Sequence, residues 1–262
     1  KKNPTTFSSV VSTFPKHKHI ENEVNDFDTQ VLLPHKMSTL GPAIAVDDIN
    51  NDGFQDYFIG GSFGNPASMY LQKNKSFIKT AIPTIEKDRL SEDVGALFID
   101  ADADGDKDLY VVSGGYEYAE NSSLLQDRLY VNDGKGNFDK AKNALPSMRT
   151  SGSKAYAIDY NNDGKQDVLV LGRQVSGKYP MPASSYMLKN ESKNGSISFK
   201  NTTTSVAPFF NKLGMATSAI ITDFNNDNWQ DIIIVGEWMP IKMYQNNKGV
   251  FIDVSHKLGE NN

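Results

Sequence analysis

The stretch that decides the fold is AYAIDYNNDGKQDVLVLG, residues 155–172, because it recurs in three other places. The other copies are AIAVDDINNDGFQDYFIGG from Ala43, ALFIDADADGDKDLYVVSGG from Ala96 and SAIITDFNNDNWQDIIIVG from Ser218. In each copy, two apolar runs flank a nine-residue loop of Asp, Asn and Gly, which predicts a strand, a turn and a strand. The loops begin at Asp48, Asp100, Asp159 and Asp223, so the spacing between successive loops increases along the chain while the loop length stays constant.

A further pair of short strands is predicted after each copy, with turn sequences such as Asp133–Gly136 and Asn246–Gly249 between its members. Each repeat therefore supplies four antiparallel strands, and such a sheet must stack on its neighbours to cover both of its faces. The sequence predicts an all-β fold, a β-propeller or a portion of one, with the Asp-rich loops between the first and second strands of each blade. The expected divisions are an N-terminal segment, 1–40, and four blades at about 41–92, 93–152, 153–214 and 215–262.

Positions 1, 3, 5 and 9 of every loop carry only Asp or Asn. A calcium ion takes about six to eight oxygen ligands, and alternating positions of a tightly curled loop direct their side chains to one centre. The sequence therefore predicts up to four calcium ions, held by the side chains of Asp48, Asn50, Asp52, Asp56, Asp100, Asp102, Asp104, Asp108, Asp159, Asn161, Asp163, Asp167, Asp223, Asn225, Asp227 and Asp231. By analogy with such loops, position 7 offers its backbone carbonyl, here from Phe54, Asp106, Lys165 and Trp229.

Position 6 is Gly in the first three loops, as a sharp turn requires, and Asn228 in the fourth, the non-Gly residue best able to take a positive φ. An EF-hand opens with the same spacing, but it requires a Glu at position 12 and flanking helices. Position 12 here lies inside an apolar strand, at Ile59, Val111, Val170 and Ile234, which excludes an EF-hand. One alternative stays open, namely that the Asp and Asn residues only form turns.

These residues resemble the FG-GAP or VCBS repeat, the blade motif of integrin α-subunit propellers and of many bacterial surface proteins. The likeness extends over about residues 41–254. The stretches EDVGALFIDADADGDKDLYVVSGG, LQDRLYVNDGKGNF, GKYP and IIIVGEWMPI more closely resemble Bacteroidetes-type VCBS surface proteins associated with ASPIC/UnbV modules. The resemblance implies calcium in the named loops and a binding or scaffolding role outside the cell or on the bacterial surface, outer-membrane-associated or periplasmic.

The resemblance fails in the number of blades, because four repeats are clear whereas such propellers usually close with about seven. Residues 1–40 have no Asp-rich loop of their own. Within them, Thr5 to Val11 could supply an outer strand, which would either close a ring with the last blade or belong to an upstream blade.

A partner, protein or glycan, is expected on the face opposite the calcium loops. The connections predicted there are residues 60–67, 113–126, 172–184 and 236–240, and they vary in length. Aromatic side chains on loops often mark recognition surfaces. The candidate ligand-binding residues are therefore Phe63, Tyr116, Tyr118, Tyr179 and Trp238, with packing between blades as the alternative.

Other classes of protein find little support. The net charge is -5 without a dense Lys/Arg cluster, which argues against nucleic acid, and no apolar run approaches the ~20 residues of a membrane helix. There is no Cys, phosphate loop, nucleophile elbow or HExxH motif, so we expect no enzyme. The enzymatic alternative is a calcium-dependent polysaccharide lyase or hydrolase built on a propeller. A third possibility is a purely structural part of an envelope complex.

Overall fold

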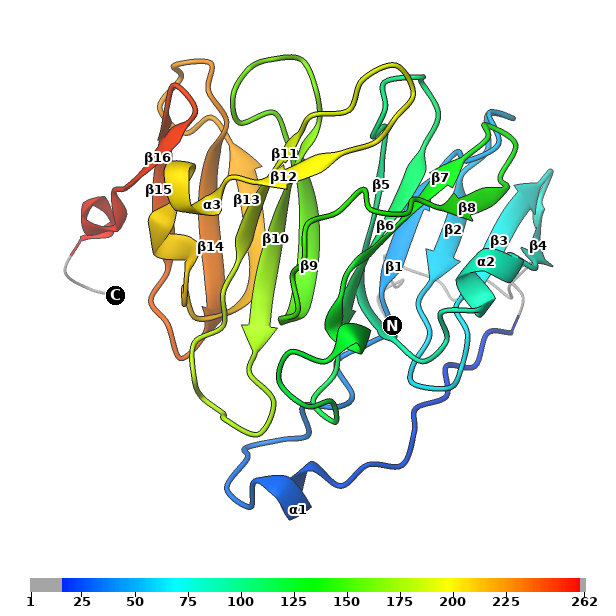
Figure 1. The fold of residues 1–262 in the computed structure, drawn as a ribbon, viewed down its shortest axis with the longest axis horizontal. Helices are drawn as coiled ribbons and strands as arrows, with labels where there is room; N and C mark the ends of the chain where they lie inside the picture. The colour runs from blue at the N-terminus through cyan, green and yellow to red at the C-terminus, as the bar shows by residue number, and fades with distance from the viewer. Residues whose placement is uncertain (1–15, 260–262) are drawn as a thin grey trace, which may run out of the picture.

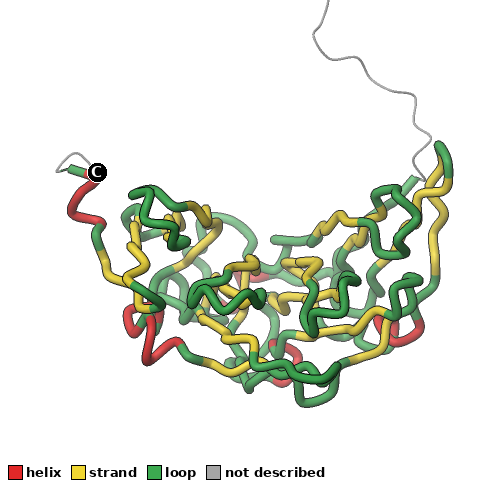
Figure 2. Tube along the Cα trace, turned by 90° about the horizontal axis from the view of Figure 1, so that it is seen from above, coloured by secondary structure: helices red, strands yellow, loops and turns green. Residues whose placement is uncertain are grey.

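The computed structural model describes residues 16–259, and four antiparallel sheets of four strands supply most of its regular structure. Within each sheet the strands lie in the order in which they follow one another along the chain. The sheets themselves stand side by side in chain order, as the colours of Figure 1 show. Seen from above, they form a curved array with a concave side (Figure 2). The arrangement is consistent with propeller blades, and none of the four described sheets closes on itself.

The strands of the four sheets are three to eight residues long. The first holds β1 (Ile44–Asp47), β2 (Asp56–Ile59), β3 (Ser68–Lys73) and β4 (Ser76–Thr80). The second holds β5 (Glu92–Ile99), β6 (Asp108–Gly114), β7 (Arg128–Asn132) and β8 (Phe138–Lys140). The third holds β9 (Ser151–Ile158), β10 (Asp167–Gln174), β11 (Tyr186–Asn190) and β12 (Phe199–Asn201). The fourth holds β13 (Met215–Thr222), β14 (Asp231–Glu237), β15 (Lys242–Asn247) and β16 (Val250–Asp253).

The predicted all-β fold and the strand pairs of each repeat are confirmed. Every Asp-rich loop connects the first strand of its sheet to the second, and its ninth residue begins the second strand. One local expectation is wrong, because Asn246 and Asn247 were expected in a turn and instead end β15. The turn there is the two-residue connection of Lys248 and Gly249.

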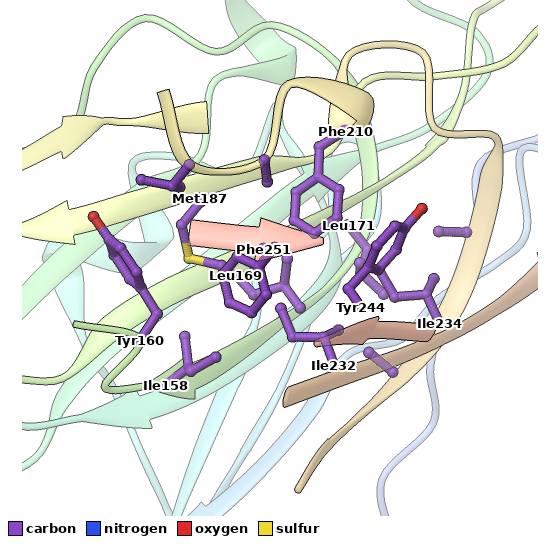
Figure 3. Packing of buried hydrophobic residues seen from close by; sticks show 14 residues of the cluster. Ile158, Tyr160, Leu169, Leu171, Met187, Phe210, Ile232, Ile234, Tyr244 and Phe251 are labelled. Atoms are coloured by element: carbon purple, nitrogen blue, oxygen red, sulfur yellow. The ribbon is translucent and has the colours of Figure 1, made fainter. Parts of the chain in front are cut away.

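Apolar side chains fill the space between neighbouring sheets. Between the third and fourth sheets, Leu169 and Leu171 of β10 lie in one cluster with Ile232 and Ile234 of β14 (Figure 3). Tyr244 of β15 stacks on Phe209 with 4.3 Å between ring centroids. Two further clusters fill the gaps between the first and second sheets and between the second and third.

The two middle sheets are covered on both faces, and the two end sheets on one. All residues of β6 and β10 are buried, which accounts for their nearly continuous apolar sequences. In contrast, β1 exposes alternate residues, Ile44 (63%) and Val46 (55%), and β13 exposes Ile220 (61%). The alternation in β1 therefore indicates which of its faces meets the next sheet.

The helices are short and lie in connections. They are α1 (Asp26–Thr29), α2 (Pro83–Glu86) and α3 (Thr203–Val206), together with the 3-10 turns η1 (Ser123–Leu125), η2 (Pro208–Phe210) and η3 (Ser255–Leu258). Within residues 16–259, none of them has the length and apolar character needed to cross a bilayer. The strand expected at Thr5 to Val11 lies outside the described residues.

Residues 16–40 run across the ends of the sheets as an extended segment that carries α1 (Figure 1). The buried carboxylate of Asp26 accepts hydrogen bonds from the backbone N–H groups of Met37 (2.5 Å) and Ser38 (2.8 Å), which folds the segment back on itself. Leu33 and Met37 are buried against Tyr116 and Met215. The segment thus covers part of the face that lies opposite the Asp-rich loops.

Candidate functional site

The four Asp-rich loops share one backbone conformation. Positions 4 and 6 have positive φ in every copy, at Asn51, Ala103, Asn162 and Asn226 for position 4 and at Gly53, Gly105, Gly164 and Asn228 for position 6. The expectation that Asn228 replaces Gly in a left-handed conformation is confirmed by its φ of 67°. Position 4 was not anticipated, and Ala103 is the one residue there that is not Asn.

In the first, third and fourth loops the polar side chains bind the backbone of their own loop. In the third loop, Asp159 accepts hydrogen bonds from the N–H groups of Asp163 (3.1 Å) and Gly164 (2.9 Å). Asn161 also accepts from Asp163 N–H (2.9 Å), and Asp163 accepts from Lys165 N–H (3.1 Å). The first and fourth loops repeat these contacts through Asp48, Asn50, Asp52, Asp223, Asn225 and Asp227. The side chains therefore help to form the turns, as the open alternative supposed.

The second loop keeps two of these contacts, from Gly105 N–H to Asp100 (3.2 Å) and from Asp106 N–H to Asp104 (3.0 Å), but it also brings three acidic side chains together. Carboxylate oxygens of Asp100, Asp102 and Asp104 all lie within 4.8 Å of one another, the one such group of His, Cys, Asp and Glu within residues 16–259. Buried oxygens of Asp100, Asp102 and Asp106 have no hydrogen-bond partner. Buried acceptors normally accept a hydrogen bond, so these oxygens require a hydrogen-bond donor or a cation. A hard divalent cation fits this all-oxygen group.

The protonation behaviour of the second loop agrees with this interpretation. Burial raises the pKa of Asp102, and repulsion from Asp104 adds to the increase. Burial and the neighbouring Asp104 raise the pKa of Asp106 to about 6. Both pKa increases arise because negative charges lie close together without a counterion. A bound cation would remove this repulsion.

The Asp at position 9 joins each loop to the third strand of its sheet. Asp56, Asp108, Asp167 and Asp231 are fully buried. One oxygen of each accepts a hydrogen bond from a third-strand N–H, at Gln72 (2.7 Å), Asn132 (2.9 Å), Asn190 (2.7 Å) and Asn246 (2.7 Å). Burial raises the pKa of Asp108 and of Asp167 to about 7. Position 9 thus has a structural role, and its role as a calcium ligand stays a prediction.

Three Asn side chains at the ends of third strands connect each sheet to the one before it. Their side-chain amides donate to the position-2 carbonyl of the preceding loop, from Asn132 to Ile49 (2.7 Å), from Asn190 to Ala101 (2.9 Å) and from Asn246 to Tyr160 (2.8 Å). Each amide also donates to the position-8 carbonyl of its own loop, at Lys107, Gln166 and Gln230 (3.1 Å each). We call this set of three residues the Asn ladder. The sequence signal for it was a recurring Asn late in the third strand.

Gln side chains at position 8 add a second link between loops. Gln166 accepts a hydrogen bond from the N–H of Asp100 (3.1 Å), and Gln230 accepts one from the N–H of Asp159 (2.8 Å). The first residues of the second and third loops are therefore each connected to the position-8 Gln of the following loop. A cavity of about 170 Å³ lies between the second and third loops and is lined by Asp100, Asp102, Lys107 and Lys165, among others.

The opposite face holds the candidate ligand-binding aromatics, and only some are exposed. Trp238 is 73% exposed and Phe63 37%, while Tyr179 is half-buried. Tyr116 and Tyr118 are 4% and 7% exposed, so the expectation that they project from loops is wrong. The hydroxyl of Tyr116 donates to the side chain of Gln30, because the N-terminal segment crosses over this loop.

Trp238 begins a chain of polar contacts on this face. Its indole N–H donates to the hydroxyl of Tyr179, which in turn donates to Glu237 (3.0 Å). Glu237 also forms a salt bridge with Arg173 (2.5 Å). The exposed indole ring is therefore held in place by side chains from two neighbouring sheets.

A polar pocket of about 260 Å³ opens on the same face, between the second and third sheets. Buried polar atoms of two of its residues, Gln174 Oε1 and Ser176 Oγ, have no hydrogen-bond partner. Its remaining lining residues include Glu120, Asn121, Arg149, Thr150, Tyr186 and Lys212. The sequence prediction placed the surrounding loops on this face but did not single out these residues, because polar residues in loops are common.

The fold and the loops together define an all-β protein of stacked, four-stranded, blade-like sheets with Asp-rich connections. Two segments, residues 48–111 and 100–170, match the model of the FG-GAP-like repeat, and they contain the first three Asp-rich loops. FG-GAP-like repeats are thus found at two places in the chain. No curated protein matches the sequence.

Solved structures provide a second comparison, in which 26 chains match. One is a lectin of Agrocybe aegerita, described by its specific recognition of non-reducing terminal N-acetylglucosamine. It shares 16% sequence identity with this chain at a TM-score of 0.50, and the match covers 82% of this chain and 51% of that one. The chain therefore spans about half the length of this structure. At this identity the likeness supports the fold alone.

Proposed function

We propose that this chain is a non-catalytic, calcium-binding module of β-propeller type that binds a glycan on the face opposite its Asp-rich loops. The observation that carries the proposal is the polar pocket between the second and third sheets, with unpartnered buried atoms of Gln174 and Ser176. The hydroxyl groups of a ligand can donate hydrogen bonds to Gln174 Oε1, and they can both donate to and accept from the hydroxyl of Ser176. Arg149 and Lys212 at its rim suit a glycan with acidic or strongly accepting groups.

Calcium is the proposed cofactor, with the second loop as the site best supported. The unpartnered oxygens of Asp100, Asp102 and Asp106 support it there, and the repeated spacing extends it to the other three loops. FG-GAP-like repeats of this kind are often calcium loops. Such loops in extracellular modules bind with a Kd of about 10⁻⁴ to 10⁻³ M, which agrees with a location outside the cell or on a bacterial surface and not with the cytosol.

The relatives favour a binding role over other roles. A lectin with the same fold recognises a terminal sugar, and FG-GAP-like repeats occur in extracellular proteins. We extend glycan recognition to this chain because of its own polar pocket and the exposed Trp238, since aromatic rings commonly stack on sugar rings. A protein partner remains an outcome of the binding test. The finer likeness to Bacteroidetes-type VCBS proteins is part of the same proposal.

A glycan-binding screen in calcium tests this function. Arg149→Ala should weaken binding of the selected glycan at least tenfold, because it removes the guanidinium at the pocket rim. Arg89→Ala is the matched control, since Arg89 is also exposed but lies outside the pocket. Equal loss in both variants, or no glycan bound by the parent protein, would count against the proposal. Capture of a protein that Arg149→Ala no longer binds would replace the glycan with a protein partner.

The enzymatic alternative differs from the proposed binding function in that it releases a product. Incubation with a panel of acidic polysaccharides should yield neither unsaturated oligosaccharides, detected by absorbance, nor new reducing ends. Either product, formed in proportion to protein and calcium, would establish a polysaccharide lyase or hydrolase and overturn the non-catalytic assignment.

A further inference from the structure

Acidic side chains also gather far from the Asp-rich loops, where the N-terminal segment meets the second sheet. Glu92 is the first residue of β5 and is 1% exposed. Within residues 16–259, no N–H or hydroxyl group donates a hydrogen bond to either of its carboxylate oxygens, and its polar neighbour is the carboxyl group of Glu117. A buried carboxylate without a donor or a counterion is costly, so this side chain either shares a proton with Glu117 or binds a cation.

The neighbouring residues contribute further oxygens. A Cβ atom added at Gly115 would lie 2.8 Å from Glu92 Oε2 and 3.0 Å from Glu117 Oε2, so both carboxylates lie beside the backbone of Gly115 and close to each other. Glu117 Oε2 accepts a hydrogen bond from the backbone N–H of Tyr116 (2.9 Å), and Glu117 Oε1 accepts one from the side-chain amide of Asn22 (3.1 Å). The carbonyl oxygen of the Asn22 amide is buried and unpartnered. A carboxylate oxygen of Glu21 is buried and unpartnered as well.

Among residues 16–259, no Lys or Arg forms a salt bridge with Glu21, Glu92 or Glu117. The buried cation Arg128 forms its salt bridge with Asp93 (2.6 Å) and also donates to Ser113. His19 binds the other oxygen of Glu21 (2.6 Å) and so does not reach the unpartnered one. Burial, together with repulsion from Glu117, Glu21 and Asp93, raises the pKa of Glu92 to about 9.

We propose that Glu21, Asn22, Glu92 and Glu117 form a second kind of cation site, which binds calcium and fastens the N-terminal segment to the second sheet. Their donor atoms are all oxygens, as a hard divalent cation prefers. They are spaced more widely than the Asp100–Asp102–Asp104 group, so calcium binding draws the Glu21 and Asn22 side chains inward. Because these two residues belong to the segment that covers Tyr116, calcium at this site controls how firmly the segment is held on the ligand face.

Counting bound calcium tests the site. Equilibrium dialysis of the full chain with radioactive calcium at pH 7.5 should show that Glu92→Gln binds one ion fewer than the parent protein. Glu117→Gln should give the same loss, and it lies at a partly exposed position where folding is less sensitive. Glu23→Gln is the matched control, because this exposed Glu lies two residues from Glu21 and outside the group.

The count also separates this site from the Asp-rich loops. If the loops bind no calcium, the parent protein still binds one ion and Glu92→Gln binds none. If all variants bind equally, the proposal is wrong and the carboxyl groups of Glu92 and Glu117 share a proton instead.

Hydrogen exchange adds an independent readout, in which calcium should slow exchange of the amides of residues 16–25 in the parent protein but not in Glu92→Gln. An equal effect of calcium on both proteins would contradict the proposed fastening.

Discussion

The side-chain amide of Asn246 donates a hydrogen bond to the backbone carbonyl of Tyr160, 86 residues earlier in the chain (2.8 Å). The same amide donates to the carbonyl of Gln230 in its own sheet (3.1 Å), so one buried side chain joins the third and fourth sheets. We therefore expect the Asn ladder to stabilise the stacking of sheets independently of the apolar clusters between them.

The first prediction concerns this ladder. Asn246→Ala leaves the buried carbonyl of Tyr160 without its donor and the buried N–H of Gly249 without its acceptor, and each unmet group costs about 1–3 kcal/mol. The free energy of unfolding should fall by about 2–4 kcal/mol, measured by urea denaturation in calcium. Asn247→Ala, at the exposed neighbouring position, should change it by less than about 0.5 kcal/mol. Equal stability of the two variants would mean that water replaces the ladder contact.

The second prediction separates calcium binding from turn formation. Asp102 has an unpartnered buried oxygen and belongs to the group of three acids in the second loop. Asp102→Ala should lower the melting temperature in calcium by several degrees, because one bound ion is lost. In metal-free buffer the same variant should melt at the parent temperature or above it, since repulsion within the loop is relieved.

Exposed Asp139→Asn serves as control for the loop variant, and should melt like the parent protein in both buffers. A decrease for Asp102→Ala of the same size with and without calcium would show that Asp102 only shapes the turn. An unchanged parent melting temperature after chelation, with no metal found by elemental analysis, would remove the calcium assignment altogether.

The third prediction concerns backbone strain in the same loop. Ala103 adopts a φ of 65°, where the other three loops have Asn. A left-handed conformation costs an ordinary residue about 1 kcal/mol more than it costs Asn or Gly. Ala103→Asn should therefore raise the melting temperature by about 2–4 °C. Ala119→Asn, at an exposed loop position without a positive φ, should not raise it.

The fourth prediction is a pH dependence of the metal-free protein. Burial raises the pKa of Asp127 to about 7, and its carboxylate accepts hydrogen bonds from Ser113 N–H (2.8 Å) and the hydroxyl of Tyr110 (2.7 Å). The folded state therefore binds a proton that the unfolded state releases at lower pH. Its contribution to stability is present below the ordinary carboxyl pKa of about 4 and is lost as the pH rises toward about 7.

The melting temperature of the metal-free protein should accordingly decrease between pH 5 and pH 7.5, as followed by circular dichroism. Asp127→Asn should flatten this dependence, because an amide in the same place stays neutral at every pH. A slope that is unchanged in Asp127→Asn would assign the effect to other groups, of which Asp108 and Asp167 have a pKa of about 7 through burial.

The repeated features of the fold could be predicted from the sequence because each appears four times. The strands, the loop length and the left-handed residue at position 6, including Asn228, follow from local patterns of apolar residues, Asp, Asn and Gly. The left-handed conformation at position 4 could not be predicted, because Asn51, Asn162 and Asn226 are also typical of ordinary turns. Ala103 gives no signal at all for a left-handed conformation.

The features that depend on contacts between distant segments could not be predicted. Asn246 precedes Asn247, Lys248 and Gly249, so local sequence favours a turn, and only its partner Tyr160 explains its burial. Likewise, nothing local indicates that residues 16–40 fold over Tyr116. The pocket near Gln174 combines residues from four connections, and polar side chains in separate loops carry no sign that they converge.

The Asn ladder has a direction, and this direction matters while the chain is being made. In each of its contacts between sheets, the acceptor, such as the carbonyl of Ile49, belongs to an earlier sheet than its donor, here Asn132. A ribosome releases the earlier sheet first, so its loop is already formed when the Asn of the next sheet emerges. Each new sheet can therefore dock on a finished surface, and the array can grow from its first sheet to its last without waiting for the complete chain.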